Sequence, residues 1–203
     1  MAVKVHLVEN YSLTKFELKR KMKISIETER LILREIEHTD KNDLYEMDAD
    51  PAVHLYIENR PATSIDEVIA AIEGIKNQYK ENGIARWAVV DKLTRECIGW
   101  AGLKFFKQAL NNHNYFYELG YRFKKKHWGK GFATEASGAV LDYGFMNLNI
   151  DKVYAITDPE NTASKKVLIK LGFYFKETFD YEGSPTDWFE LAKENWLDNK
   201  CCI

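Results

Sequence analysis

Hydrophobic residues in the first quarter of the chain recur first at strand spacing and then at helical spacing. Residues 27–36, ETERLILREI, predict a first strand. In the segment that follows, Thr39 or Asp40 is placed to cap a short helix that turns Leu44 and Met47 inward. The pattern therefore predicts a strand followed by a short helix.

A longer helix is predicted over residues 64–82. Ser64 and Glu67 have the spacing of a capping box, in which each side chain bonds the backbone amide of the other residue. Asn82 and Gly83 then end the helical pattern. The apolar positions at helical spacing are Ile65, Val68, Ile69, Ile72 and Tyr79.

The remaining pattern predicts six more strands and two more helices. The strands are expected over 84–90, 97–105, 115–123, 152–157, 173–181 and 187–192. The helices are expected from Gly131 to about Asn147, and from about Asn161 to Leu171 with Gly172 as the cap. This order of elements predicts an α/β (α+β) domain with a mixed sheet of seven strands.

Composition and length favour one folded domain. The chain has 203 residues, of which 45% are hydrophobic and 30% charged, as in ordinary globular proteins. We place the domain at 25–195. Residues 1–24 alternate only weakly and form an extension of open role, and residues 196–203 are expected to be a C-terminal tail.

Charge and cysteine content narrow the function classes. The net charge of -2 argues against a nucleic-acid binder, which usually carries a basic excess. Three cysteines without metal-ligand spacing predict neither a disulfide framework nor a metal site, and they fit a cytoplasmic protein. No apolar run reaches membrane-spanning length, so no membrane partner is expected.

Residues 124–136, KKKHWGKGFATEA, combine a glycine pair with a lysine run just before a predicted helix. Gly129 and Gly131 would let backbone amides approach an anion at the positive end of the helix. Taken alone, the same residues fit a tight turn beside a solvated lysine run. Neither GxxxxGK[ST] nor GxGxxG is present, so the P-loop and dinucleotide-binding motifs are not supported.

The segment 126–136 resembles motif A of the GNAT acyltransferases, and its WGKGFATEA form resembles the branch of ribosomal-protein N-terminal acetyltransferases, the RimJ/RimL type. Lys126 departs from the family pattern, which has Arg or Gln at that position. The resemblance extends from Thr28 to Leu191. It also includes the segments 28–34 (TERLILR), 98–99 (IG), 118–121 (ELGY), 161–164 (NTAS) and 171–173 (LGF).

This resemblance implies the GNAT fold, a mostly antiparallel seven-stranded sheet with helices on both faces, and acetyl-CoA between the splayed fourth and fifth strands. It implies pyrophosphate on the loop amides and pantetheine along the fourth strand. Asn161, which also fits a plain helix cap, would contact the pantetheine arm. The cofactor-binding residues so implied are Tyr121, Arg122, Phe123, Lys126, His127, Trp128, Gly129, Lys130, Gly131, Phe132, Ala133, Asn161 and Ser164.

Acetyl transfer to an amine requires a proton acceptor and a way to release the thiolate. Glu118 is the first candidate for the base and Glu182 the second, although a strand glutamate can also simply face solvent. Many GNAT enzymes have a tyrosine seven residues after the motif's Asn, where this chain has Leu168. In the branch that the chain resembles, Ser164 fills that role, and it is equally placed as a first-turn helix serine.

The sequence thus predicts an acetyl-CoA-dependent N-acetyltransferase acting on a small-molecule or peptide amine. The acceptor is a protein N-terminus, an amino acid, a polyamine or an antibiotic. The alternative is a catalytically silent GNAT domain that binds acyl-CoA as a sensor or structural partner. No metal, nucleic acid or membrane partner is expected, and a homodimer stays open.

Overall fold

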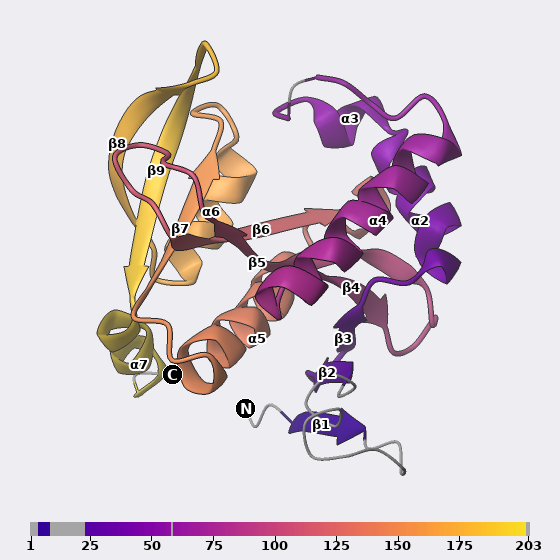
Figure 1. Cartoon of the computed structure of the whole chain (residues 1–203), viewed down its shortest axis with the longest axis horizontal. Coiled ribbons are helices and arrows are strands. Elements are labelled where there is room, and N and C mark those ends of the chain that lie inside the picture. The colour runs from indigo at the N-terminus through magenta and orange to yellow at the C-terminus, as the bar shows by residue number, and fades with distance from the viewer. Residues whose placement is uncertain (1–3, 9–22, 58, 202–203) are drawn as a thin grey trace.

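The computed structural model describes residues 4–8, 23–57 and 59–201 (Figure 1). The strands are β1 (Lys4–Val8), β2 (Lys23–Glu27), β3 (Leu31–Glu35), β4 (Arg86–Asp91), β5 (Cys97–Phe106), β6 (Phe116–Phe123), β7 (Lys152–Thr157), β8 (Tyr174–Tyr181) and β9 (Ser184–Ala192). The α-helices are α2 (Lys41–Asp48), α3 (Pro51–His54), α4 (Ile65–Asn82), α5 (Phe132–Asn147), α6 (Thr162–Lys170) and α7 (Lys193–Cys201). Short 3₁₀ turns are η1 (His38–Asp40) and η2 (Lys125–His127).

All the strands join one sheet in the order β1-β2-β3-β4-β5-β6-β7-β9-β8. Every pairing is antiparallel except that between β6 and β7. Figure 1 shows the C-terminal strands at one end of the sheet and the N-terminal hairpin at the other. The predicted mixed, mostly antiparallel α/β fold is confirmed.

The predicted count of seven strands is wrong, because β1 and β2 add two strands beside β3. Their weak hydrophobic alternation fits an edge hairpin, whose outer strand has only one neighbour to pack against. The extension that we placed at 1–24 therefore contributes strand residues 4–8 and 23–24, while residues 9–22 lie outside those that the structure describes.

Helices cover both faces of the sheet, as the family resemblance implies. On one face, α5 and α6 bury a core that includes Val140, Phe145 and Leu168. On the other face, α2, α3 and α4 bury a smaller core that includes Met47 and Ile72. The strands between the two layers carry apolar side chains in both directions, which explains their nearly continuous hydrophobic character.

The predicted helix boundaries are largely confirmed, with a different cap on α4. This helix spans Ile65–Asn82 and ends at Gly83, which has a left-handed φ of 72°. The capping box is not formed as predicted. Glu67 instead accepts hydrogen bonds from the backbone amide and the hydroxyl of Thr63, one residue before the N-cap Ser64. The predicted capping box and the observed contact with Thr63 each provide an acceptor for a backbone N–H group just before the helix.

The C-terminal segment forms a helix, and the boundary predicted at residue 195 falls inside it. Trp196 of α7 is 7% exposed and packs against Phe145, and its indole donates to Asp142 at 3.0 Å. Residues 202–203 lie outside the described part. Among the described residues, no helix combines the length and apolar character needed to span a bilayer.

Candidate active site

β6 and β7 pair over only two positions and then separate. Tyr117 lies opposite Val153 and Glu118 opposite Tyr154, with no further register between the two strands. From there β6 continues to Phe123, still paired with β5 on its other side, and β7 continues to Thr157, paired with β9. The separation leaves one edge of β6 without a strand neighbour. This is the opening that the family resemblance implies between the fourth and fifth predicted strands.

Main-chain direction decides which residues of β6 face this opening. The amide of Lys124 donates to the carbonyl of Ile98 on β5 at 3.0 Å. Because successive residues of a strand direct their N–H and C=O groups to opposite edges, Arg122 also faces β5, while Tyr121 and Phe123 face the opening. Tyr121 and Phe123 thus present their backbones to the opening, as a β-like partner for pantetheine requires, whereas Arg122 does not.

The loop after β6 leads into the N-terminus of α5. The η2 turn is closed by the amides of His127 and Trp128, which donate to Lys124 and Lys125. Gly129 and Gly131 then have φ of 72° and 81°, in the left-handed region that favours glycine. Within the described residues, no hydrogen bond is recorded for the amides of Gly129, Lys130 and Gly131, so these donors and the helix N-terminus are available to an anion.

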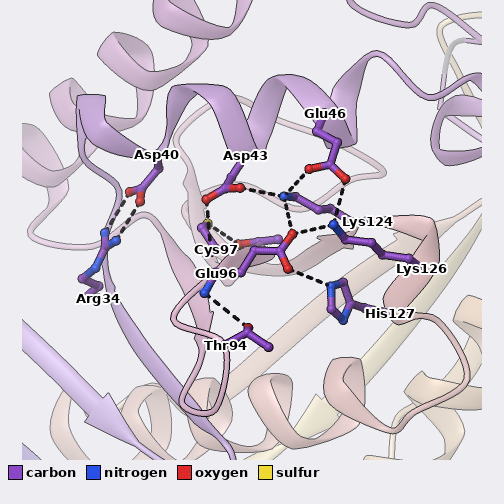
Figure 2. Close-up of polar contacts among 11 residues, drawn as sticks. Arg34, Asp40, Asp43, Glu46, Thr94, Glu96, Cys97, Lys124, Lys126 and His127 are labelled. Atoms are coloured by element: carbon purple, nitrogen blue, oxygen red, sulfur yellow. Dashed lines mark hydrogen bonds and ion pairs between the residues drawn. The ribbon is translucent and has the colours of Figure 1, made fainter.

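The first lysine of the run is buried and does not face this loop. Lys124 is 2% exposed, and its Nζ lies 2.8 Å from Asp43 Oδ1, 2.8 Å from Glu46 Oε2 and 2.7 Å from Glu96 Oε1 (Figure 2). Asp43 and Glu46 come from α2, and Glu96 from the turn between β4 and β5. Burial alone lowers a lysine pKa, but these three carboxylates outweigh it and raise the pKa of Lys124.

Lys126 and His127 join the same carboxylates. Lys126 Nζ lies 2.9 Å from Glu46 Oε1 and 2.7 Å from Glu96 Oε1, and His127 Nε2 lies 3.6 Å from Glu96 Oε2. Burial lowers the pKa of His127. Burial by itself raises the pKa of the Glu96 carboxyl, but hydrogen bonds from the two lysines lower it to about 2. The side chains of Lys126 and His127, implied as cofactor contacts, are thus turned towards carboxylates.

Glu135 ties the N-terminus of α5 to the start of β3. Its Oε1 accepts from Thr28 Oγ1 at 2.6 Å and from the amide of Arg30 at 3.0 Å, and its Oε2 accepts from Arg30 Nε at 2.6 Å. Arg30 also donates to the carbonyl of Lys130 and lies over the ring of Phe132. The segments 28–34 and 126–136, which carry the resemblance separately, are therefore in contact.

Trp128 and Ala133 complete the loop. Trp128 is 48% exposed, and its indole N–H donates to the carbonyl of Phe123 at 2.8 Å, so one of the acceptors facing the opening is occupied by the chain itself. Ala133 packs against the core below α5. Trp128 thus ties the loop to β6, and Ala133 ties the start of α5 to the core.

Glu118 is 6% exposed and faces the layer of α2 and α4. Arg86 of β4 reaches across β5 and places its Nη2 3.1 Å from Glu118 Oε2. A Cβ at Gly120 would lie 3.0 Å from Arg86 Nη2, so the glycine leaves room for this guanidinium. Among the described residues, no hydrogen bond is recorded for Oε1 of Glu118. The candidate base thus has one oxygen held and one available.

Arg122 lies four residues after Glu118 on the same face of β6. Its Nη1 donates to Asp48 of α2 at 2.7 Å, and its guanidinium lies 5.3 Å from the ring of Trp100. Arg86 stacks on the same ring at 4.7 Å. Sequence reasoning missed Arg86 and Asp48 as neighbours of the site. The role of Arg86 becomes visible only from the register of β4, β5 and β6. This register places Arg86 opposite Gly102 and Gly102 opposite Gly120, so two glycines leave the guanidinium a path towards Glu118.

Asn161 and Ser164 lie at the start of α6. Asn161 is the N-cap, and its Oδ1 accepts from the amide of Ser164 at 3.0 Å, so the plain capping role is present. The hydroxyl of Ser164 lies 3.0 Å from the hydroxyl of Tyr121, which connects α6 to the unpaired part of β6. Burial raises the pKa of Tyr121 to about 12. Leu168, where many relatives have tyrosine, is 1% exposed in the core.

Glu182 lies apart from these residues at the tip of the β8–β9 hairpin. It is exposed and has a φ of 53°, and Gly183 beside it has a φ of 84°. Positive φ at both positions is the geometry of a two-residue hairpin turn. The strand after the turn begins at Ser184, three residues earlier than predicted. Within the described residues, Glu182 makes no recorded contact with Glu118 or Ser164.

The fold and this arrangement define a class of protein with an opened sheet edge and a glycine-containing helix start whose loop amides have no hydrogen-bond partner in the described residues. Residues 30–174 match the model of the acetyltransferase (GNAT) domain. The chain is similar to the uncharacterized N-acetyltransferase p20 of Bacillus licheniformis, with 37% identity over 84% of this chain and 90% of that protein. The chain therefore belongs to the GNAT family, and it is an acetyltransferase enzyme.

Solved structures agree with this fold. The ribosomal-protein-S5-alanine acetyltransferase of Vibrio fischeri has a TM-score of 0.68 at 21% identity, with 85% of this chain and 98% of that chain covered. The spermidine N-acetyltransferase of Vibrio cholerae, in complex with CoA and spermine, has a TM-score of 0.66 at 22% identity, with coverages of 84% and 99%. The family resemblance found in the sequence is confirmed.

Proposed function

We propose that this chain transfers the acetyl group of acetyl-CoA to a primary amine by direct attack on the thioester. The observation that carries the proposal is the separation of β6 and β7 immediately after Glu118, beside the left-handed glycines at the start of α5. This arrangement places the opening for the donor next to the buried carboxylate of Glu118, which lies on the face of the sheet opposite α5. The CoA complex of the Vibrio cholerae relative supports the same class of donor.

The donor would lie with its pyrophosphate on the amides of residues 129–133 and its pantetheine along Tyr121 and Phe123. The chain fits such a ligand because these loop amides have no recorded partner in the described residues. The backbone N–H groups facing the opening would stabilise the charge that develops on the thioester carbonyl oxygen. Asn161 keeps its amide nitrogen for the ligand, since its Oδ1 already caps α6.

The acceptor amine must lose a proton before or during attack. Glu118 would accept that proton, directly or through water, with its Oε1, while Arg86 holds Oε2 and fixes the carboxylate. Ser164, positioned by Tyr121, would donate to the departing thiolate. Glu182 remains a second candidate for the base through its place in the β8–β9 turn.

A Glu118→Gln variant tests this assignment. Removing the base should lower kcat about a hundred- to ten-thousand-fold and leave CoA affinity within about two-fold, since the amide keeps the shape of the side chain. The measurement is acetyl turnover across grouped amines: spermidine, peptides with free N-termini, single amino acids and aminoglycosides. Glu182→Gln is measured in parallel as the test of the second candidate.

The outcome also decides between the two candidate bases and the silent alternative. If Glu118→Gln retains full turnover while Glu182→Gln loses it, Glu182 is the base. If the wild-type chain binds CoA but acetylates no amine of the panel, the chain is a silent acyl-CoA-binding domain. The acceptor class is the one that gives the highest kcat/KM.

A further inference from the structure

Three carboxylates converge on one buried ammonium at the point where β6 ends. Asp43, Glu46 and Glu96 offer oxygen atoms within 4.8 Å of one another, an arrangement that could hold a cation. Figure 2 shows the ammonium of Lys124 among them, with one contact to each. An ammonium has three donors, so Lys124 is fully satisfied by this cluster. We call these four residues the Lys124 cluster.

The cluster joins three parts of the chain that are distant in sequence. Asp43 and Glu46 belong to α2, Glu96 ends the β4–β5 turn, and Lys124 connects β6 to the η2 turn. The backbone of Lys124 is fixed as well. Its amide donates a hydrogen bond to the carbonyl of Ile98, and its carbonyl accepts one from the amide of His127 in η2. The direction in which the loop leaves the sheet is therefore set at Lys124.

The lysine cannot act by attracting phosphate. Its side chain is 3% exposed and is turned towards α2, and its charge is balanced by carboxylates. Gly129 and Gly131 give the loop between η2 and α5 much conformational freedom. A fixed starting point is therefore needed to keep the amides of this loop in the positions that the phosphates require. The ammonium of Lys124 is buried although Asp43 and Glu46 are partly exposed, and salt screens such partly buried ion pairs less than it screens an exposed lysine run.

We propose that Lys124 is the positioning residue of the pyrophosphate loop, and that it acts through Asp43, Glu46 and Glu96 to hold the loop amides ready for the phosphates of CoA. This inference rests on the proposed function for the location of the donor. It adds that α2, on the face opposite α5, determines the affinity for CoA.

A Lys124→Met variant tests the role by comparing two ligands. CoA contains the pyrophosphate, and pantetheine lacks both of its phosphates but retains the same arm. Loss of loop positioning should weaken CoA binding at least ten-fold and leave pantetheine binding within about two-fold, at both low and high salt. Isothermal calorimetry measures both affinities without requiring turnover, so an inactive chain with an intact CoA site is still informative.

Two further variants keep the test decisive. Arg34→Met removes the bidentate ion pair with buried Asp40, just before α2, and should lower stability without changing the ratio of the two affinities. Glu96→Gln keeps two of the three carboxylates. It should change the ratio of the two affinities in the same direction as Lys124→Met, but by less. If Lys124→Met does not fold, Glu96→Gln takes its place in the test.

Three results would overturn the inference. One is an unchanged affinity of Lys124→Met for CoA, or of Glu96→Gln if it has to serve instead. Another is an equal loss for both ligands, as general unfolding of the site would give. The third is a wild-type chain that does not bind CoA at all, which would remove the donor site itself.

Discussion

At the scale of single residues, burial changes the meaning of the lysine run. As a sequence, KKK before a glycine pair suggests a positive surface for phosphate. In the structure, Lys124 and Lys126 are held by carboxylates from α2 and the β4–β5 turn, which lie 28 to 81 residues away along the chain. Nothing in the local sequence identifies these partners. The glycines, in contrast, are recognisable from the sequence because the left-handed conformation favours them wherever it occurs.

Gly129→Ala should weaken CoA binding more than it weakens the fold. Its φ of 72° is unfavourable for alanine and costs about 1 kcal/mol, although a Cβ would meet no atom within 4 Å. Gly83→Ala is a matched control, since Gly83 has the same φ and the same free space at the end of α4. Both variants should lose similar stability in chemical denaturation, and only Gly129→Ala should lose affinity for CoA. Equal affinities would argue against a binding role for the loop.

At the scale of elements, the sequence predicts most helices and strands but not how they are locked together. Periodicity and caps give α4, α5 and α6 nearly to the residue. Helices α4 and α6 each have an apolar stripe, α5 is buried on most of its faces, and each of the three has a glycine or polar cap at an end. It does not reveal that Thr28 and Arg30, at the start of β3, hold the first turn of α5 through Glu135. Such contacts depend on which elements become neighbours in the sheet.

Glu135→Ala should therefore destabilise the domain. Its carboxylate accepts hydrogen bonds from Thr28 and from both the backbone and the side chain of Arg30, and a hydrogen bond to a charged group contributes about 1.5–3 kcal/mol. We expect a loss of about 2 kcal/mol in the free energy of unfolding, measured in urea. Thr28→Val should lose part of that amount. A change below about 0.5 kcal/mol for Glu135→Ala would contradict this role.

At the scale of the whole molecule, carboxylates with lowered pKa values hold separate parts together. Hydrogen bonds from Lys124 and Lys126 lower the pKa of Glu46. Burial opposes the shift at Glu135 and Glu190, but hydrogen bonds from Thr28 and Arg30, and from Tyr174 and Lys152, lower their pKa values too. Together with Glu96, these groups connect α2, β3, β7 and β9 to their neighbours. The fold thus depends on charged carboxylates in both halves of the sheet.

Stability should consequently fall in acid. A carboxyl whose pKa is lower in the folded state stabilises the fold fully above its unfolded pKa, near 4.5, and this contribution is lost as the pH falls through the folded value, about 2 for Glu96. The free energy of unfolding should decrease from about pH 5 towards pH 2. In Glu96→Gln the decrease should be smaller. A pH dependence identical to that of the wild-type chain would show that Glu96 does not contribute to it.

The sequence by itself determined the family, the order of the main elements from β3 to β9 and the glycines of the loop. It did so because periodicity, caps and left-handed turns are local properties, and because motif order follows the chain. The tertiary structure decided which charges meet. Arg86 reaches Glu118, Asp48 reaches Arg122, and three carboxylates enclose Lys124 only after the sheet register and the position of α2 are fixed. Side chains of either charge are common along the chain, so their pairing depends on distances in space that the sequence alone does not contain.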